Sequence, residues 1–237
     1  MKVVFVVPMF NAAPHVGDLV KSLQEQTNPN WEAVLIDDMS DDDTIFMVNH
    51  TVGNDERFKF IVNKEKKYAL KNVVENSINV AKEKDCVIAI LDGDDAICNK
   101  NTVDLILEAY KDDEVGTVWT AHRWDINNIN ISKELPQNIR INPYEYPWVS
   151  SHLKTFRSKL LLEINEENFK DLDGEWFKRG YDQALYLPLL YLSIKRKYID
   201  EICYLYRINS NSMKHREWKE QDQLSTVKLV RARGFIR

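Results

Sequence analysis

The sequence predicts an α/β fold in which a mainly parallel central sheet is flanked by helices. Short apolar runs of strand length alternate with segments of helical periodicity through the first half of the chain. These runs are almost continuously apolar, which is typical of parallel strands buried on both faces. The composition, with 44% hydrophobic and 29% charged residues, is that of a soluble globular protein. The 237 residues are enough for one large domain.

The first half is expected to contain five strands and four helices. The strands are expected at residues 3–7, 33–36, 58–62, 87–91 and 117–121. The first helix is marked by Val16, Leu19, Val20 and Leu23, which follow the i, i+3, i+4, i+7 pattern of one helical face. The other helices are expected to begin near Thr44 and to cover residues 68–82 and 103–110.

The second half is less regular. Residues 124–147 are rich in Asn, Pro and aromatic side chains and predict a long structured loop. Helices are expected at 154–164, from Asp182 to about 192 and at 218–230, with a strand at 201–206. Pro188 predicts a kink or an early stop in the second of these helices. We expect a single domain, 1–237, with a regular half (1–115), an irregular half (116–215) and a closing helix (216–237).

Charge and cysteine content narrow the range of partners and locations. A net charge of −5 argues against nucleic acid as a partner, because phosphate binding requires a basic surface. The three cysteines show no pairing or metal-binding pattern and are expected as small core residues in a reducing compartment. The apolar run at 3–7 is too short for a signal sequence or a membrane span. We therefore expect a cytoplasmic protein without a transmembrane segment, with peripheral membrane contact left open.

Carboxylates follow two of the predicted strands. Asp37 and Asp38 end the second strand, and the segment Asp92-Gly93-Asp94-Asp95 follows the fourth. The carboxyl ends of parallel strands face one crevice, where ligands bind in open α/β sheets. If the segment stays extended, Asp92 and Asp94 project to the same side. Clustered carboxylates suit Mg²⁺ or Mn²⁺, whereas the run 41–43 is better explained by capping of the helix at Thr44.

Five segments of the chain resemble, in the same order, the motifs of family 2 glycosyltransferases. The first three are VVPMFNA (6–12), AVLIDDMSDDDT (33–44) and AILDGDDAI (89–97). GYDQALYLPLL (180–190) resembles the acidic motif that places the catalytic base at a helix start, and YLYRINSNSMKH (204–215) resembles the late Tyr-Arg segment. The resemblance implies a GT-A fold and an inverting enzyme that uses a nucleotide-sugar donor. It also implies that 1–115 binds the donor and 116–215 the acceptor.

The resemblance implies a role for each matching residue. Donor binding is assigned to Pro8, Phe10, Asn11, Asp37, Asp38, Lys71, Asp92, Gly93, Asp94 and Arg207. Pro8 and Phe10 are expected to line the base, and Asp38 or Asp37 to accept its hydrogen bond, which favours a UDP-sugar. Mn²⁺ or Mg²⁺ is expected on Asp94 and Asp92, with His215 as a further ligand. Asp95 is expected to support the metal or contact the donor sugar.

The chain departs from the family pattern in three places. Met39 replaces a usual Gly, and NKEKKYALKN lacks the Gly common in that segment. A basic residue there commonly contacts the diphosphate, and here Lys67 or Lys71 could do so. A His often present after the Tyr-Arg pair is Asn209 here, which leaves His215 as the nearby candidate.

Asp182 is expected to be the general base that takes the proton from the acceptor hydroxyl. The alternative is that Asp182 only caps the helix that it opens. Trp148, His152 and Trp176 lie in the half expected to bind the acceptor glycan or glycoconjugate, and indoles stack well on sugar rings. The alternative for each Trp is a place in the core.

Three other functions fit parts of the sequence less well. A sugar-phosphate nucleotidyltransferase would need a basic, Gly-rich loop after the first strand, and PMFNAAPHVG contains no Lys or Arg. A glycoside hydrolase needs two opposed carboxylates, which leaves the metal-type cluster unexplained. A catalytically silent nucleotide-sugar-binding protein would not need both Asp94 and Asp182.

Overall fold

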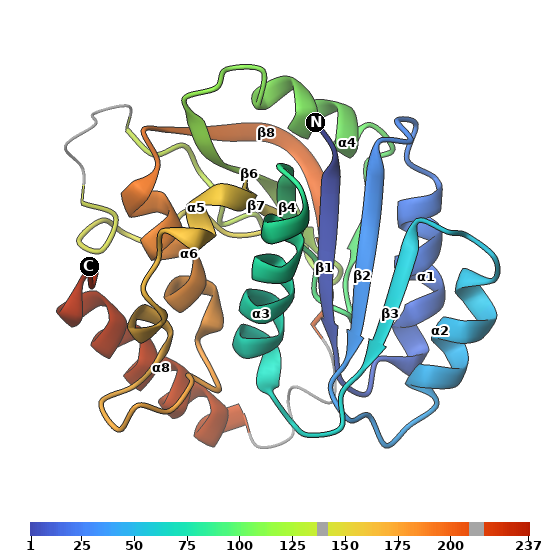
Figure 1. Cartoon of the computed structure of the whole chain (residues 1–237), viewed down its shortest axis with the longest axis horizontal. Coiled ribbons are helices and arrows are strands. Elements are labelled where there is room, and N and C mark those ends of the chain that lie inside the picture. The colour runs from blue at the N-terminus through green and yellow to red at the C-terminus, as the bar shows by residue number, and fades with distance from the viewer. Residues whose placement is uncertain (137–141, 209–215) are drawn as a thin grey trace.

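The computed structural model describes residues 1–136, 142–208 and 216–237. Its centre is a sheet of eight strands in the order β3-β2-β1-β4-β7-β6-β8-β5 (Figure 1). The strands are β1 Val3–Met9, β2 Trp31–Asp37, β3 Phe58–Val62, β4 Val87–Ile90, β5 Ala96–Ile97, β6 Val115–Trp124, β7 Lys154–Arg157 and β8 Lys195–Tyr206. Strands β3, β2, β1 and β4 are parallel, β7 is antiparallel to both neighbours, and β6 and β8 are parallel. The predicted α/β class with a mainly parallel sheet is confirmed.

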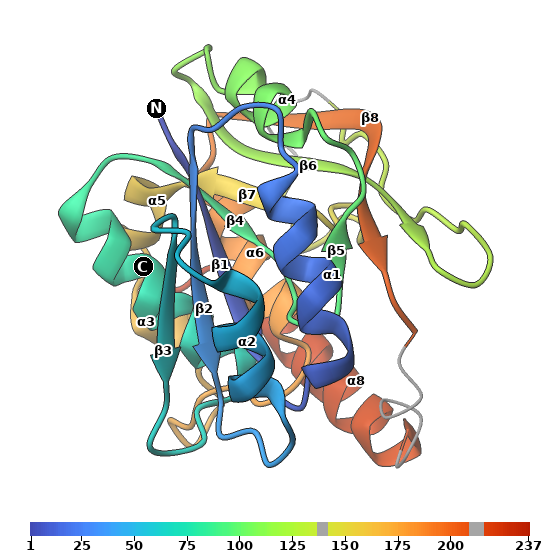
Figure 2. The same ribbon diagram turned by 90° about the vertical axis from the view of Figure 1, so that its right-hand side faces the viewer.

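Helices cover both faces of this sheet. They are α1 Ala13–Gln24, α2 Thr44–Val52, α3 Tyr68–Glu83, α4 Thr102–Ala109, α5 Ser158–Leu162, η1 Glu166–Phe169, α6 Tyr181–Leu192 and α8 Arg216–Arg233. Figures 1 and 2 show α1 and α2 on one face and α3 and α6 on the other. No helix in the described ranges is both long and apolar enough to cross a membrane.

The alternation of β1 divides the core into two layers. Val3, Phe5 and Val7 pack in a cluster that includes the apolar stripe of α1. Val4 and Val6 point to the opposite face and pack with residues of α3 and α6. All seven residues of β1 are buried, as expected for a strand covered on both sides.

Two predictions in the second half are wrong. Residues 154–164 are not one helix, because Lys154–Arg157 form β7 between β4 and β6 before α5 begins at Ser158. The buried side chains at 154–156 fill this central position, which overrides the local helical pattern. The second is the early stop expected as one outcome at Pro188, because α6 continues to Leu192; the other outcome, a kink, stays a prediction. The short elements β5 and η1 were not expected from the sequence.

Candidate active site

The acidic segment after β4 forms a tight turn at the carboxyl end of the sheet. The Asp95 amide donates to the Asp92 carbonyl at 3.0 Å. The segment is therefore turned, and the condition of an extended backbone, under which Asp92 and Asp94 would project to the same side, is not met. Gly93 lies against β1, and its amide donates to the Pro8 carbonyl at 3.1 Å. A Cβ at position 93 would be 2.5 Å from Met9 Cγ and 2.9 Å from the Pro8 oxygen. A glycine is therefore required where the turn passes the end of β1.

The carboxylate of Asp92 lies at the centre of the site. The Tyr181 hydroxyl donates to Asp92 Oδ1, and His152 Nδ1 lies 3.9 Å from Asp92 Oδ2. Burial and the charges of Asp182 and Asp94 raise the pKa of Asp92 to about 6, although the positive charge of Lys154 opposes this shift. Asp92 thus carries a negative charge that the surrounding protein compensates incompletely.

Asp95 has a different role, because both of its oxygens are occupied. The Tyr204 hydroxyl donates to Asp95 at 2.7 Å, and the Arg207 amide donates to it at 2.7 Å. Arg207 also donates to the Asp94 carbonyl at 3.1 Å and to the Asp18 carboxylate at 2.9 Å. Its guanidinium therefore connects the acidic turn to α1. Contact of Arg207 with a diphosphate stays a prediction.

The oxygen atoms at this turn supply some, but not all, of the ligands that a hard divalent cation needs. Asp92 and Asp94 offer carboxylate oxygens, and the Asp94 side chain makes no hydrogen bond or ion pair within the described ranges. Mg²⁺ and Mn²⁺ accept one or two carboxylates together with water and substrate phosphates. However, the described residues contain no group of three or more His, Cys, Asp or Glu side chains arranged to hold a metal. The third expected ligand, His215, lies outside the described residues.

Asp182 is held by a buried lysine. Lys154 Nζ lies 2.5 Å from Asp182 Oδ1, and the Lys154 side chain is fully buried. Lys154 Nζ also lies 3.2 Å from His152 Nδ1. Burial of Asp182 acts to raise its pKa, but the charge and hydrogen bond of Lys154 outweigh this effect and lower the pKa below its ordinary value. Gly180 occupies the N-cap of α6, so the capping alternative for Asp182 is wrong.

The carboxylate of Asp38 accepts hydrogen bonds from backbone amides at the amino end of α3. It accepts hydrogen bonds from the Lys67 amide at 2.8 Å, the Tyr68 amide at 2.9 Å and the Asn63 side chain at 3.0 Å. Asp37 is also buried, and its Oδ2 accepts from the Ser40 amide at 3.1 Å. Asp37 Oδ1 has no hydrogen-bond partner within the part of the chain that the structure describes. Base binding by either residue stays a prediction.

A lysine that the sequence analysis missed lies beside the expected base-binding motif. Lys66 Nζ is 2.9 Å from the centroid of the Phe10 ring and donates to the Asp38 carbonyl at 2.8 Å. Phe10 is 52% exposed, so the face of this pair is open. The two lysines that are the candidates for the diphosphate pair with Glu75, at 2.8 Å for Lys67 and 3.8 Å for Lys71, and contact of either with a diphosphate stays a prediction.

The other residues of the first motif have structural contacts. Pro8 is buried within β1. The side chain of Asn11 donates to the Asp41 carboxylate at 2.6 Å and accepts from the Asp41 amide at 3.0 Å. Asn11 has a φ of +54°, and Met39 has a φ of +61° at the position where the family usually has a Gly. Donor binding by Pro8 and Asn11 stays a prediction.

The three expected acceptor residues do not share one environment. Trp148 packs edge-on against Tyr186, with ring centroids 6.5 Å apart, and Trp176 stacks on Phe169 at 5.9 Å. Both indoles pack against the core on the α3 and α6 side of the sheet, which favours the core alternative. Of the three, His152 is the residue that contacts the carboxylate site. Its surroundings lower the pKa of His152 well below the ordinary value, through burial and the nearby charge of Lys154.

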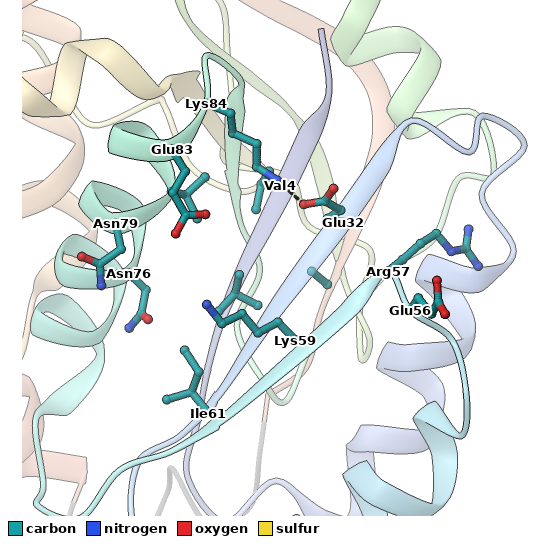
Figure 3. A pocket seen from close by; sticks show the side chains of 13 residues that line it. Val4, Glu32, Glu56, Arg57, Lys59, Ile61, Asn76, Asn79, Glu83 and Lys84 are labelled. Carbon is teal, nitrogen blue, oxygen red and sulfur yellow. Dashed lines mark hydrogen bonds and ion pairs between the residues drawn. The ribbon is translucent and has the colours of Figure 1, made fainter.

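A separate groove of about 150 Å³ lies between α3 and the amino ends of β2 and β3 (Figure 3). Glu32 and Lys84 form an ion pair there, and Lys59 points into the groove. None of the residues predicted for donor, metal or acceptor binding lines this groove. It is therefore distinct from the carboxylate site at the other end of the strands.

Solved glycosyltransferases of the GT-A fold are structural neighbours of this chain, which has the same mainly parallel sheet flanked by helices. The model of "Glycosyl transferase family 2" matches residues 4–164, and the chain belongs to this family. The resemblance seen in the sequence motifs is confirmed, and the protein is a glycosyltransferase.

Similar proteins cover most of the chain. Glycosyltransferase GlyG of Streptococcus pneumoniae is 24% identical over 224 residues, which cover 90% of this chain and 73% of GlyG. The mannosyltransferase PcManGT from Pyrobaculum calidifontis, solved with GDP-Man and Mn²⁺, superposes with a TM-score of 0.67 at 16% identity, over 95% of this chain and 62% of that one. S. aureus TarS, solved with UDP-GlcNAc, gives a TM-score of 0.64 at 17% identity, over 89% of this chain and 59% of that one. These two structures establish the shared fold, and this chain spans about three fifths of their length.

Proposed function

We propose that this glycosyltransferase moves a sugar from a nucleotide diphosphate sugar, with UDP favoured, to a hydroxyl of a glycan or glycoconjugate. We further propose that the transfer needs Mn²⁺ or Mg²⁺ and inverts the anomeric centre. The observation that carries this proposal is the coupling of two adjacent residues of α6 to the site. Tyr181 donates to Asp92 of the acidic turn, and Asp182 pairs with buried Lys154.

The contacts of Asp182 suit a general base. Lys154 holds Oδ1, which leaves Oδ2 as the oxygen that would take the proton of the acceptor hydroxyl. The lowered pKa keeps the carboxylate ionised at neutral pH, which a base requires before it can accept a proton. The Asp182 side chain is 31% exposed, so an acceptor can reach it. One displacement assisted by one base inverts the configuration of the sugar.

Donor binding uses the turn and the end of β1. A divalent cation on Asp92 and Asp94 would stabilise the negative charge of the departing diphosphate. Lys66 supplies a positive charge beside Phe10, where the resemblance places the base, and it belongs to the segment NKEKKYALKN, in which a basic residue commonly contacts the diphosphate. A nucleotide-sugar donor is supported by the two similar structures, which were solved with UDP-GlcNAc and with GDP-Man and Mn²⁺. Because those nucleotides differ, the preference for UDP rests on the motif around Asp37 and Asp38.

The test is nucleotide release from a panel of UDP-, GDP- and dTDP-sugars with Mn²⁺ and mixed glycan acceptors. We expect release with at least one donor, abolition by EDTA, and loss of about 10²-fold or more in Asp182→Asn. Asp113→Asn is the matched control, because the Asp113 side chain is 97% exposed. An NMR assignment of the product anomer tests inversion. Release that persists in EDTA, or an active Asp182→Asn, would contradict the proposal.

A further inference from the structure

Four aromatic rings lie in a row beside the carboxylate site, three of them stacked and the fourth, Trp124, tilted by 41° against Tyr206. The His152 ring centroid lies 4.7 Å from that of Tyr204 and 5.2 Å from that of Tyr206, with both pairs nearly parallel. The Tyr206 ring in turn lies 6.0 Å from Trp124. We call Trp124, Tyr206, His152 and Tyr204 the ring ladder. The sequence analysis did not consider Trp124 or Tyr206 as acceptor residues.

The ring ladder leads from the core outwards. Tyr204 is fully buried and His152 is 7% exposed, whereas Tyr206 and Trp124 are only half-buried. Trp124 and Tyr206 are register partners at the ends of β6 and β8, and the Asp125 amide donates to the Tyr206 carbonyl at 2.9 Å. Figure 2 shows the loop that follows β6 projecting from the molecule at this point. The sheet therefore fixes the two outer rings at the rim of the site.

The inner end of the ring ladder touches the groups that hold the base. His152 Nδ1 lies 3.2 Å from Lys154 Nζ, which in turn lies 2.5 Å from Asp182. The Tyr206 ring is thus linked to Asp182 through His152 and Lys154. In keeping with this geometry, burial and the charges of Asp95, Asp92 and Asp182 raise the pKa of Tyr206.

Half-buried rings at this place have the chemistry of a sugar platform. The apolar C–H face of a pyranose packs on an aromatic face, while its hydroxyls stay free at the ring edge. The loop beyond Trp124 adds Asn127 and Asn128, whose amides suit sugar hydroxyls, and Ile126, which is 67% exposed. Phe10, the exposed ring on the donor side, lies with Lys66 at the end of β1, separate from the ring ladder.

We propose that Trp124 and Tyr206 form the acceptor platform, on which the pyranose ring of a glycan acceptor stacks with its reacting hydroxyl toward Asp182. This inference rests on the proposed function, since it assigns the acceptor subsite of the same reaction. It also replaces Trp148 and Trp176 as acceptor residues.

The experiment observes the tryptophans directly in the full chain labelled with 5-fluorotryptophan. The ¹⁹F resonances of Trp124 and Trp148 are assigned from Trp124→Phe and Trp148→Phe. The protein is then titrated to about 100 mM with a fixed panel of methyl pyranosides (glucoside, galactoside, mannoside and N-acetylglucosaminide) and with their disaccharides. UDP with Mn²⁺ and GDP with Mn²⁺ are added in separate samples to test the donor site.

We expect at least one sugar to shift the Trp124 resonance saturably and to leave the Trp148 resonance unchanged. In Tyr206→Leu the half-saturating concentration should rise about three- to tenfold, as for the loss of one stacked ring, whereas Tyr206→Phe should stay within twofold. Far-UV circular dichroism confirms that each variant is folded. If Tyr206→Leu does not fold, the test is repeated in Trp124→Leu. The protein is then labelled with fluorotyrosine, and the shift of the Tyr206 resonance on sugar binding is measured.

Two results would overturn the platform. One is a Trp124 resonance that no sugar of the panel shifts, and the other is a shift that survives unchanged in Tyr206→Leu. If nucleotides bind in the separate samples but no sugar shifts the Trp124 resonance, the platform fails while the proposed function stands. Failure of every nucleotide to bind, with a saturable Trp124 shift, means that the proposed donor chemistry fails while the sugar site stands.

Discussion

Replacing Asp92 by Asn should make the metal-free protein more stable while removing its activity. Asn keeps the shape of the side chain and can still accept the hydrogen bond of Tyr181. It removes a charge that is buried beside Asp182 and Asp94. Functional sites often carry such unfavourable charges, and neutral substitutions there commonly raise stability at the expense of function.

The magnitude follows from the pKa of Asp92. Its value of about 6 in the folded protein, compared with an ordinary 3.8, corresponds to about 3 kcal/mol at most. Because the folded pKa is higher, the folded state binds the proton more tightly, and stability falls as pH rises from about 4 to above 6. Because Asn has no proton to lose in this pH range, Asp92→Asn does not undergo this fall in stability. Allowing for solvent contact at the 20% exposed side chain, we expect Asp92→Asn to gain about 1–3 kcal/mol at pH 8 and almost nothing at pH 4.

The assay is urea unfolding of wild type and Asp92→Asn in EDTA at pH 4, 6 and 8, with Asp113→Asn as the matched control at an exposed position. The melting temperature of each protein is also measured with and without Mn²⁺, since a ligand that binds the folded state raises the melting temperature. We expect Mn²⁺ to stabilise wild type and Asp113→Asn but not Asp92→Asn. If Asp92→Asn is less stable than wild type at pH 8, or if its gain does not depend on pH, the electrostatic reasoning is refuted.

Three further predictions concern Lys154, Gly93 and Asp38. Lys154→Met should raise the pKa of Asp182, because burial then acts without the opposing charge of Lys154. The acidic limb of the kcat/KM pH profile should therefore move to higher pH. Lys154→Arg, which keeps the charge, should restore part of the wild-type profile. An unchanged pH profile in Lys154→Met would mean that Lys154 does not tune the base. Gly93→Ala should cost about 1–3 kcal/mol in urea unfolding, since its Cβ would meet Met9 and Pro8. Gly17→Ala is the control, because Gly17 lies within α1 with nothing within 4 Å of its Cβ position, and it should not destabilise the protein. Asp38→Ala should cost about 0.5–2 kcal/mol by uncapping α3, and a neutral result would show that these hydrogen bonds do not stabilise the helix.

Much of the first half of the chain could be predicted because its signals are local. Apolar runs, a 3.6-residue period and the residues that follow each strand are read within a few positions, and they located β1 to β4 and the helices between them. Parallel pairing then brings the ends of β2 and β4 to one edge, so the Asp92-Gly93-Asp94-Asp95 segment could be assigned to the site before any coordinates.

Tertiary structure decided the partners of those residues. Lys154 and Asp182 are 28 positions apart and meet because β7 is inserted between β4 and β6, where the local pattern had favoured a helix. Trp124 and Tyr206 are adjacent because β6 and β8 pair in parallel. Lys66 lies over the Phe10 ring because the fold brings the segment before α3 to the end of β1, where Lys66 also donates to the Asp38 carbonyl. The sequence by itself determined the alternation of elements and the acidic ends of two strands, since these depend on neighbours along the chain. Which charges and rings meet there depends on strand order, a property of the whole sheet that no short segment encodes.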